Sequence, residues 1–203
     1  MDESLSFGVL GKRGAGLADH FGVNVRDVDI ITGSMANALS SAGGFCVGSK
    51  EVVDHQRLSG AGYCFSAALP AMLAVASIEG LHDLESNSKL LDTLRQNIQA
   101  FRKAFGDCKQ AELVGAEISP ALHLRLKRTF TQRKDEDGIL QKIVEAAAKE
   151  KIAVTRAKYI VDQEQYPPKP SIRILISAGH GAKELERAAR VLRKAIESQP
   201  TLQ

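Results

Sequence analysis

The sequence predicts a mixed α/β fold in two parts. In the first part, a short β-branched run at residues 28–31 is typical of a buried strand, and a small-residue loop and a glycine pair follow it. In the second part, apolar residues alternate at positions 122–126 and 172–176, and they recur every three or four residues at positions 91–105 and 185–196. Alternation predicts half-buried strands, and the wider spacing predicts amphipathic helices that share a core with them.

Size and composition are ordinary for a globular protein. The chain has 203 residues, of which 44% are hydrophobic and 25% charged, so it can bury a sizeable core as one large or two small domains. The net charge is only +3, Trp is absent and aromatic residues make up 5% of the chain. These values give little basis for an electrostatic footprint or a base-stacking platform, so we do not expect nucleic-acid binding.

The cysteines and the apolar runs exclude further classes. Cys46, Cys64 and Cys108 are odd in number and widely spaced, which predicts reduced thiols facing the cytosol. We expect no metal centre, because the histidines do not group with cysteine or acidic residues at ligand spacing. The longest apolar stretch, residues 67–76, is short and interrupted by Pro70, so no membrane span is predicted. The first residues do not have the pattern of a secretory signal, so none is predicted.

In the first part, a loop with several glycines at residues 7–16 has two interpretations, a nucleotide-binding loop or a surface loop with left-handed turns. The second is favoured, since no βαβ unit frames the loop. A short strand at residues 45–47 and a helix at residues 52–58 come next. Pro70 then suits the first turn of an apolar helix that extends past Leu81.

A polar, turn-prone stretch at residues 85–88 is the predicted boundary between the domains, residues 1–85 and 86–203. The basic run at residues 125–134 is interpreted as a solvated loop, with a docking patch for CoA phosphates or membrane headgroups as the alternative. His123 is expected on the strand surface. The remaining elements of the second part are a helix at residues 137–150, a strand starting at residue 152 and a stiff proline-rich loop at residues 165–170 that could rim an active-site mouth.

The most informative motif is the segment that follows the first strand. Asp29-Ile30, Gly33-Ser34, Ala38 and Gly43-Gly44-Phe45 match the lysine segment of the α-oxoamine synthases, and the chain resembles this family of pyridoxal-phosphate (PLP) enzymes. Those enzymes join an amino acid to an acyl-CoA with loss of carbon dioxide. The resemblance implies the aspartate-aminotransferase-like fold, with residues 1–85 as an incomplete large domain and residues 86–203 as the small α+β domain.

Two positions depart from the pattern of active members. Asn37 stands where they carry the lysine, and an amide cannot form the Schiff base that anchors PLP. Leu5 stands where they carry a histidine that contacts the ring oxygen, whereas Asp2 keeps the place of the aspartate that pairs with the ring nitrogen. The resemblance therefore implies that this chain has no catalytic residue of its own.

The chain also resembles the lysine-less subunits of serine palmitoyltransferases, one branch of the family, in four segments: residues 2–11, 43–46, 54–59 and 62–67. This resemblance implies a lysine-bearing partner that holds PLP covalently, L-serine and palmitoyl-CoA as substrates, and the cytosolic face of the endoplasmic reticulum membrane. We expect the chain to be the C-terminal portion of such a subunit; a fragment, a short isoform and a truncated gene model stay open. The alternative function is a degenerate scaffold or regulator with no role in turnover.

Two further residues are carried over from the resemblance. Ser66 matches a hydroxyl residue that crosses the dimer interface to the phosphate of the partner's PLP, although a serine here could equally cap the next helix. Lys158 lies near the position of an arginine that grips the substrate carboxylate, but an ammonium group lacks the planar fork of a guanidinium. His180 stands just before the last helix, as a histidine does in relatives.

Overall fold

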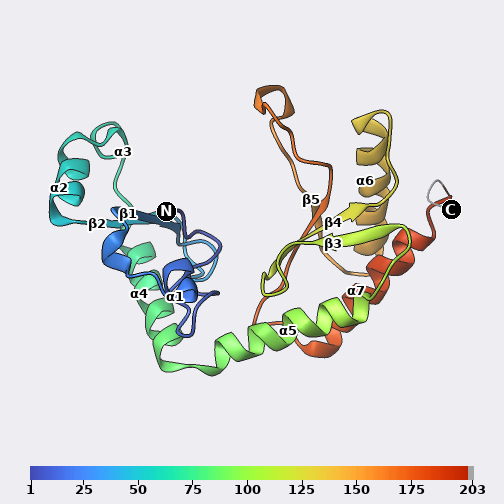
Figure 1. Cartoon of the computed structure of the whole chain (residues 1–203), viewed down its shortest axis with the longest axis horizontal. Helices are drawn as coiled ribbons and strands as arrows, with labels where there is room; N and C mark the ends of the chain where they lie inside the picture. The colour runs from blue at the N-terminus through green and yellow to red at the C-terminus, as the bar shows by residue number, and fades with distance from the viewer. Residues whose placement is uncertain (201–203) are drawn as a thin grey trace. The chain divides into compact units, whose positions relative to one another are not determined.

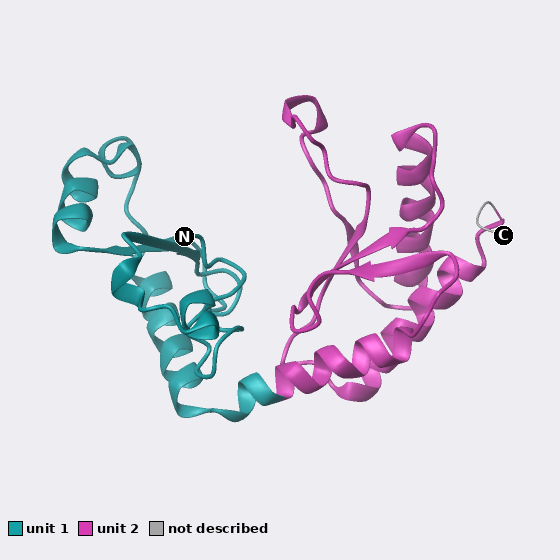
Figure 2. Ribbon diagram, viewed as in Figure 1, with its two compact units in different colours: residues 1–92 teal, residues 93–203 magenta. Residues whose placement is uncertain are grey.

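A computed structural model describes residues 1–200 of the chain. They form two compact units, unit 1 (residues 1–92) and unit 2 (from residue 93 to the end of the described chain), which are coloured separately in Figure 2. The change from one unit to the other falls within helix α5 (Lys89–Phe105), a little after the boundary that the sequence suggested at residue 85. No described helix combines the length and apolar character needed to cross a bilayer.

Unit 1 is organised around a β-hairpin of β1 (Ile30–Ser34) and β2 (Gly44–Gly48), which pair antiparallel with Gly33 opposite Phe45 (Figure 1). A Cβ atom on Gly33 would lie 2.5 Å from the Phe45 ring, so the pairing requires glycine there. The expectation of a buried strand is wrong for this chain, since Ile30 is 38% exposed. A two-stranded sheet leaves most of its surface uncovered.

Short helices surround the hairpin. Ser49 accepts a hydrogen bond from the backbone N–H of Val52, 3.4 Å away, and so caps helix α2, which begins two residues before the predicted helix at residues 52–58. The sequence reasoning did not predict α1 or α3, because elements this short carry no measurable periodicity. The helical elements of unit 1 before α5 are α1 (Leu17–Phe21), the 3₁₀ turn η1 (Val25–Asp27), α2 (Lys50–Ser59), α3 (Ala61–Cys64) and α4 (Ala71–Ser86).

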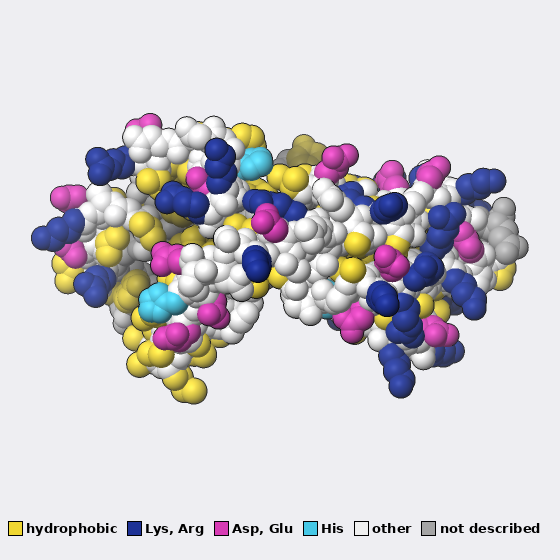
Figure 3. All heavy atoms as spheres, turned by 90° about the horizontal axis from the view of Figure 1, so that it is seen from below, with side chains coloured by type: hydrophobic (Ala, Val, Ile, Leu, Met, Phe, Trp, Pro, Cys, Tyr) yellow, Lys and Arg dark blue, Asp and Glu magenta, His cyan; other side chains and the backbone are white. Residues whose placement is uncertain are grey.

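The β1–β2 connection packs on α4. Met35 and Leu39 are buried, and the Ser77 hydroxyl, which has one hydrogen to donate, lies 3.0 Å from the Leu73 carbonyl oxygen and 3.2 Å from the Met35 sulfur. Much of the apolar surface of this unit is nevertheless open, and hydrophobic side chains are visible on it in Figure 3. The most exposed large ones on α2, α3, α4 and the segment between α3 and α4 are Leu58, Tyr63, Phe65, Met72 and Val75.

Unit 2 is built on a four-stranded antiparallel sheet with the order β3-β4-β6-β5. The strands are β3 (Ala111–Val114), β4 (Ala121–Leu126), β5 (Thr155–Arg156) and β6 (Ile172–Leu175). The two alternating patterns are confirmed as β4 and β6. β3 was not predicted, and β5 begins three residues later than expected, at Thr155 rather than at residue 152.

One face of this sheet is buried under helices. Leu122, Leu124 and Leu126 of β4 are at most 1% exposed, and Ile172 of β6 is fully buried. The helices that cover them are α5, α6 (Arg133–Lys149) and α7 (Ala182–Glu197), and a 3₁₀ turn η2 (Val161–Gln163) lies in the β5–β6 connection. Their fully buried large residues are Ile98, Phe101, Phe105, Leu140, Ile143, Leu192 and Ile196. The opposite face of the sheet carries the polar members of the alternation.

Candidate functional site

In unit 1, the loop after β1 presents Asn37 at the surface. The loop is closed at its base, where the N–H of Met35 donates to the Gly43 carbonyl at 3.0 Å, and it is anchored by the buried side chains of Met35 and Leu39. Asn37 lies between these anchors and is exposed. Its Nδ2 donates to the backbone carbonyl of Ser4, 2.7 Å away. The residue that the resemblance places at the lysine position is thus hydrogen-bonded to the chain's own N-terminal turn.

That turn runs alongside β1. The N–H of Glu3 donates to the Thr32 carbonyl at 2.7 Å, and the N–H of Thr32 donates to the Met1 carbonyl at 2.9 Å. This pairing brings Asp2 next to the strand that leads to Asn37, so two of the predicted site residues share one surface. Leu5 belongs to the same turn, and its side chain is 61% exposed.

The Asp2 carboxylate is occupied by its own turn. The N–H of Ser4 donates to Asp2 Oδ1 at 2.8 Å. Hydrogen bonds from the side chain and the backbone N–H of Ser4 lower the pKa of the Asp2 carboxyl, so this group stays ionised at neutral pH.

The glycine-containing loop is a structural element. Gly8, Gly11, Gly14 and Gly16 all have positive φ angles, as expected for a surface loop with left-handed turns. The buried carboxylate of Glu3 accepts hydrogen bonds from the N–H of Leu17, at 2.9 and 3.0 Å, and from the Ser6 hydroxyl. The loop therefore ends on a helix start that already holds an anion, which argues against the nucleotide-loop interpretation.

Ser66 lies in the irregular segment between α3 and α4, and it is exposed. Helix α4 begins at Ala71 with Pro70 in the capping position and no side-chain cap, so the alternative that Ser66 caps this helix is wrong. Within residues 1–200 the structure gives the Ser66 hydroxyl no hydrogen-bond partner. The group is free to meet a ligand or another chain.

In unit 2, polar side chains gather on the open face of the sheet. His123 of β4 lies opposite Arg173 of β6, and His123 Nδ1 shares a 2.9 Å hydrogen bond with the Ser171 hydroxyl. Desolvation, and after it the nearby charges of Arg125 and Arg173, lower the pKa of His123, so its imidazole is neutral at neutral pH. Arg125 Nε is buried without a hydrogen-bond partner in the described chain.

Besides Lys158, which stays a prediction, Arg173 is a second candidate for binding a carboxylate. Lys158 is exposed and follows the end of β5. Arg173 lies on the open face of the sheet, and within residues 1–200 no carboxylate pairs with it. The sequence signal that could have found it is the single basic residue between Ile172 and Ile174 in the closing strand.

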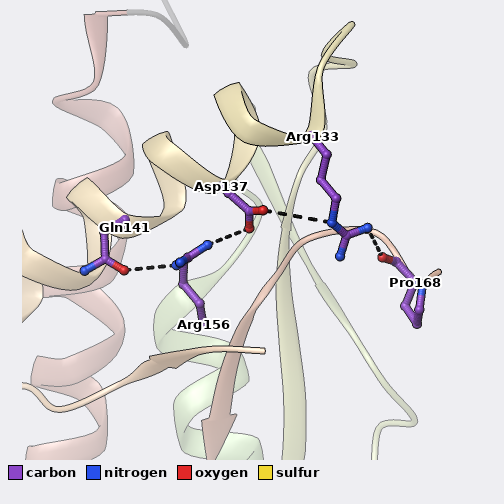
Figure 4. Close-up of polar contacts among 5 residues, drawn as sticks. All are labelled: Arg133, Asp137, Gln141, Arg156 and Pro168. Carbon is purple, nitrogen blue, oxygen red and sulfur yellow. Dashed lines mark hydrogen bonds and ion pairs between the residues drawn. The ribbon is translucent and has the colours of Figure 1, made fainter. Parts of the chain in front are cut away.

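The basic run at residues 125–134 does not form one patch. Lys127 pairs with Asp107 at 3.5 Å, and the guanidinium of Arg128 lies 5.8 Å from the Phe130 ring centroid. Arg133 donates to the carbonyl of Pro168 at 2.7 Å, as Figure 4 shows. This dispersal favours the solvated-loop interpretation over a phosphate-docking patch.

The residues of unit 1 do not fit covalent attachment of PLP. Asn37 supplies an amide in place of an amine, and that amide is bonded to Ser4. Leu5 supplies no hydrogen-bonding group for a ring oxygen, and one oxygen of Asp2 is bonded within its own turn. No step of PLP chemistry can therefore be assigned to this chain alone.

Comparisons with known proteins identify relatives of this chain. The chain is 43% identical over 201 residues to "Serine palmitoyltransferase 1" of Dictyostelium discoideum, an alignment that covers 96% of this chain and 42% of that protein. It is 41% identical over 201 residues to "Long chain base biosynthesis protein 1b" of Oryza sativa subsp. japonica, which covers 98% and 41% respectively. The chain thus spans well under half the length of these relatives, and the resemblance stated from the motifs is confirmed.

Solved structures show the same fold. Serine palmitoyltransferase from Sphingomonas wittichii matches all of this chain and 48% of its own, with a TM-score of 0.81 at 19% identity. The 8-amino-7-oxononanoate synthase of Francisella tularensis matches 97% of this chain and 54% of its own, with a TM-score of 0.76 at 23% identity. These matches confirm the predicted PLP-transferase fold.

The family model described as "Aminotransferase class I and II" matches residues 2–192. That range includes the Asp2–Asn37 surface of unit 1 and the whole sheet of unit 2. The chain belongs to the aminotransferase class I and II family.

Proposed function

We propose that this chain is part of the lysine-less subunit of a serine palmitoyltransferase, which condenses L-serine with palmitoyl-CoA to 3-oxosphinganine in sphingolipid synthesis. The observation that carries the proposal is Asn37 in the lysine position, with its amide bonded to Ser4, in a chain 43% identical to a protein named serine palmitoyltransferase 1. Residues 1–85 belong to the large domain and residues 86–203 to the small domain. The complex acts at the cytosolic face of the endoplasmic reticulum membrane.

The chemistry then comes from a lysine-bearing partner subunit that binds PLP covalently. PLP supplies an electron sink for carbon–carbon bond formation when it is bound to that partner. This chain contributes one wall of a shared site, with Asp2 and Ser66 directed toward the partner's cofactor. The exposure of Ser66 and its lack of a partner in the described chain support this role.

The open sheet face of unit 2 is the second contribution. Arg173 and Arg125 flank a neutral His123, and such a face attracts an anionic group. Arg173 has the planar fork that Lys158 lacks, so it is the better candidate for a substrate carboxylate. Lys158 keeps at most a supporting role.

The exposed apolar surface of unit 1 supports a dependence on another chain. Phe65 is 89% exposed and Met72 75% exposed, on a segment and a helix with mostly apolar side chains. Exposed apolar patches of this kind are typical of interfaces. The isolated chain should therefore be poorly soluble, and a monodisperse, cooperatively melting monomer would contradict this part of the proposal.

Co-expression with candidate lysine-bearing partners tests the proposal directly. We expect the chain to co-purify with such a partner, and the complex to form 3-oxosphinganine from serine and palmitoyl-CoA. Borohydride reduction should attach phosphopyridoxyl to the partner alone. A reduced adduct on this chain, or product formation by this chain purified alone, would contradict the proposal.

Point variants separate this function from that of a scaffold or regulator. If the chain shares the site, Ser66→Ala and Arg173→Gln should lower turnover of the intact complex, and Ser88→Ala, at another exposed serine, should not. If the chain is a scaffold, Ser66→Ala and Lys158→Ala leave turnover unchanged. A charge at the exposed apolar surface, as in Met72→Glu, should abolish assembly in either case.

A further inference from the structure

Ser4 is a junction between three segments of unit 1. Its N–H donates to Asp2 Oδ1 at 2.8 Å, its hydroxyl accepts from the N–H of Ser34 at 3.0 Å, and its carbonyl accepts from Asn37 Nδ2 at 2.7 Å. The hydroxyl of Ser34 in turn accepts from the N–H of Ala36 at 3.1 Å. The N-terminal turn, the end of β1 and the loop that carries Asn37 therefore meet at one residue.

The Asn37 bond is the long-range closure of this junction. The Asn37–Ser4 and Ser34–Ser4 bonds span 33 and 30 positions, whereas the Asp2–Ser4 and Ser34–Ala36 bonds are local. Of the two long-range bonds, only the Asn37–Ser4 bond ties the turn to the loop after β1. The buried side chains of Met35 and Leu39 hold the backbone on either side of Asn37, so the direction of its side chain is set by packing. A lysine has a longer and more flexible side chain, with a charged end that prefers water to a single backbone carbonyl.

We propose that Asn37 is a positioning residue: by its hydrogen bond to the Ser4 carbonyl it fastens the Asp2–Ser6 turn to the end of β1. We call this Asn37–Ser4 hydrogen bond the strut. In place of an amine, it fixes where Asp2 and Leu5 lie on the surface. The effect of this bond on a site shared with a partner rests on the proposed function. The strut itself is a property of unit 1 and does not depend on a partner.

The bond is near the surface, so its strength is modest. An exposed amide–carbonyl hydrogen bond contributes about 1 kcal/mol, which corresponds to roughly a fivefold change in a local opening equilibrium. Such a change is too small to unfold the chain, but it is large enough for amide hydrogen exchange to resolve. The test therefore measures local opening and turnover separately.

The experiment uses the chain purified with its co-expressed lysine-bearing partner. Asn37→Asp removes the donor and places an acceptor against the Ser4 carbonyl, whereas Asn37→Gln keeps an amide donor. Asn87→Asp makes the same chemical change at an exposed asparagine whose side chain has no hydrogen bond in the described part of the chain. The readouts are exchange rates of the Ser4, Ser34 and Ala36 amides, and kcat and KM for serine.

We expect Asn37→Asp to speed exchange at these amides about fivefold and to lower kcat several-fold, with the stoichiometry of the complex unchanged. Asn37→Gln should recover part of both effects, and Asn87→Asp should cause neither. Unchanged exchange in Asn37→Asp overturns the strut. Faster exchange with unchanged kcat and KM overturns the positioning role. If the complex that contains the chain without substitutions makes no product, the proposed function is contradicted. The exchange rates would still show whether the Asn37–Ser4 hydrogen bond holds the turn.

Discussion

Arg156 Nη1 lies 2.6 Å from Asp137 Oδ1, and this ion pair joins the edge strand β5 to the N-terminal half of α6. Arg156 Nε also donates to Gln141 Oε1 at 2.9 Å, and the other oxygen of Asp137 lies 3.9 Å from Arg133 Nε (Figure 4). Arg133 in turn donates to Pro168. Asp137 and Arg133 of α6 therefore hold β5 and the Pro168 segment of the β5–β6 connection to one helix.

Asp137→Asn should loosen this connection. The substitution keeps the shape of the side chain but removes the charge shared by Arg156 and Arg133, so we expect a loss of about 1–2 kcal/mol in the free energy of unfolding. Urea unfolding would measure it. Glu186→Gln weakens the more exposed Glu186–Arg190 pair, at 3.6 Å. It should lower the free energy of unfolding by only a few tenths of the loss expected for Asp137→Asn. Equal losses in the two variants would contradict a special role for Asp137.

Asn97→Ala should destabilise unit 2 by about 2 kcal/mol. Asn97 on α5 is 4% exposed, and its Nδ2 donates at 2.9 Å to the carbonyls of both Ser177 and His180. Removing the amide leaves two carbonyls without these donors at the turn before α7. Thermal unfolding would report the loss, and Gln163→Ala, at an exposed site, serves as the control. A melting temperature equal to that of the unaltered chain would contradict the prediction.

His123 should make stability fall as the pH is lowered from about 7 to about 5. Its pKa in the folded chain lies below the ordinary value of 6.5, chiefly because the ring is desolvated. The unfolded state therefore takes up a proton first as the pH falls, and protonation favours unfolding. His123→Gln should flatten this part of a stability-versus-pH curve. Parallel curves for the two proteins would show that another group is responsible.

Glu136 should make stability fall as the pH is raised, the opposite of the effect of His123, and in a lower pH range. Burial raises its pKa above the ordinary 4.5, against the effect of Lys169, Arg133 and Arg125, while Asp137 adds to the rise. The folded state then holds the proton longer than the unfolded state, so stability falls as the pH rises from about 4 through the folded pKa. Glu136→Gln should remove this decline and be the more stable protein at neutral pH. If Glu136→Gln is less stable than the unaltered chain at neutral pH, the nearby cations outweigh the cost of burying the Glu136 carboxylate, and the prediction is wrong.

The elements predicted well from the sequence are those with strong periodicity. The stripe from Leu91 to Phe105 became α5, and the alternations around Leu124 and Ile174 became β4 and β6. β3 was missed because Ala111-Glu112-Leu113-Val114 lacks a clear apolar–polar alternation, and its pairing with β4 makes it a strand. The run at residues 28–31 looked buried by composition, but exposure depends on which neighbours cover a strand.

The amino-acid sequence alone determined the family resemblance, the amide in the lysine position and the apolar faces that build the core of unit 2, because these depend on residue identity and on local spacing. Only the tertiary structure decided that Asn37 is bonded to Ser4, that Arg173 lies beside His123, and that Ser66 is left without a helix to cap. The physical reason is that these relationships join residues far apart in the chain or depend on where a helix begins. Strand register, helix ends and packing create them, and no local pattern of residue types encodes them.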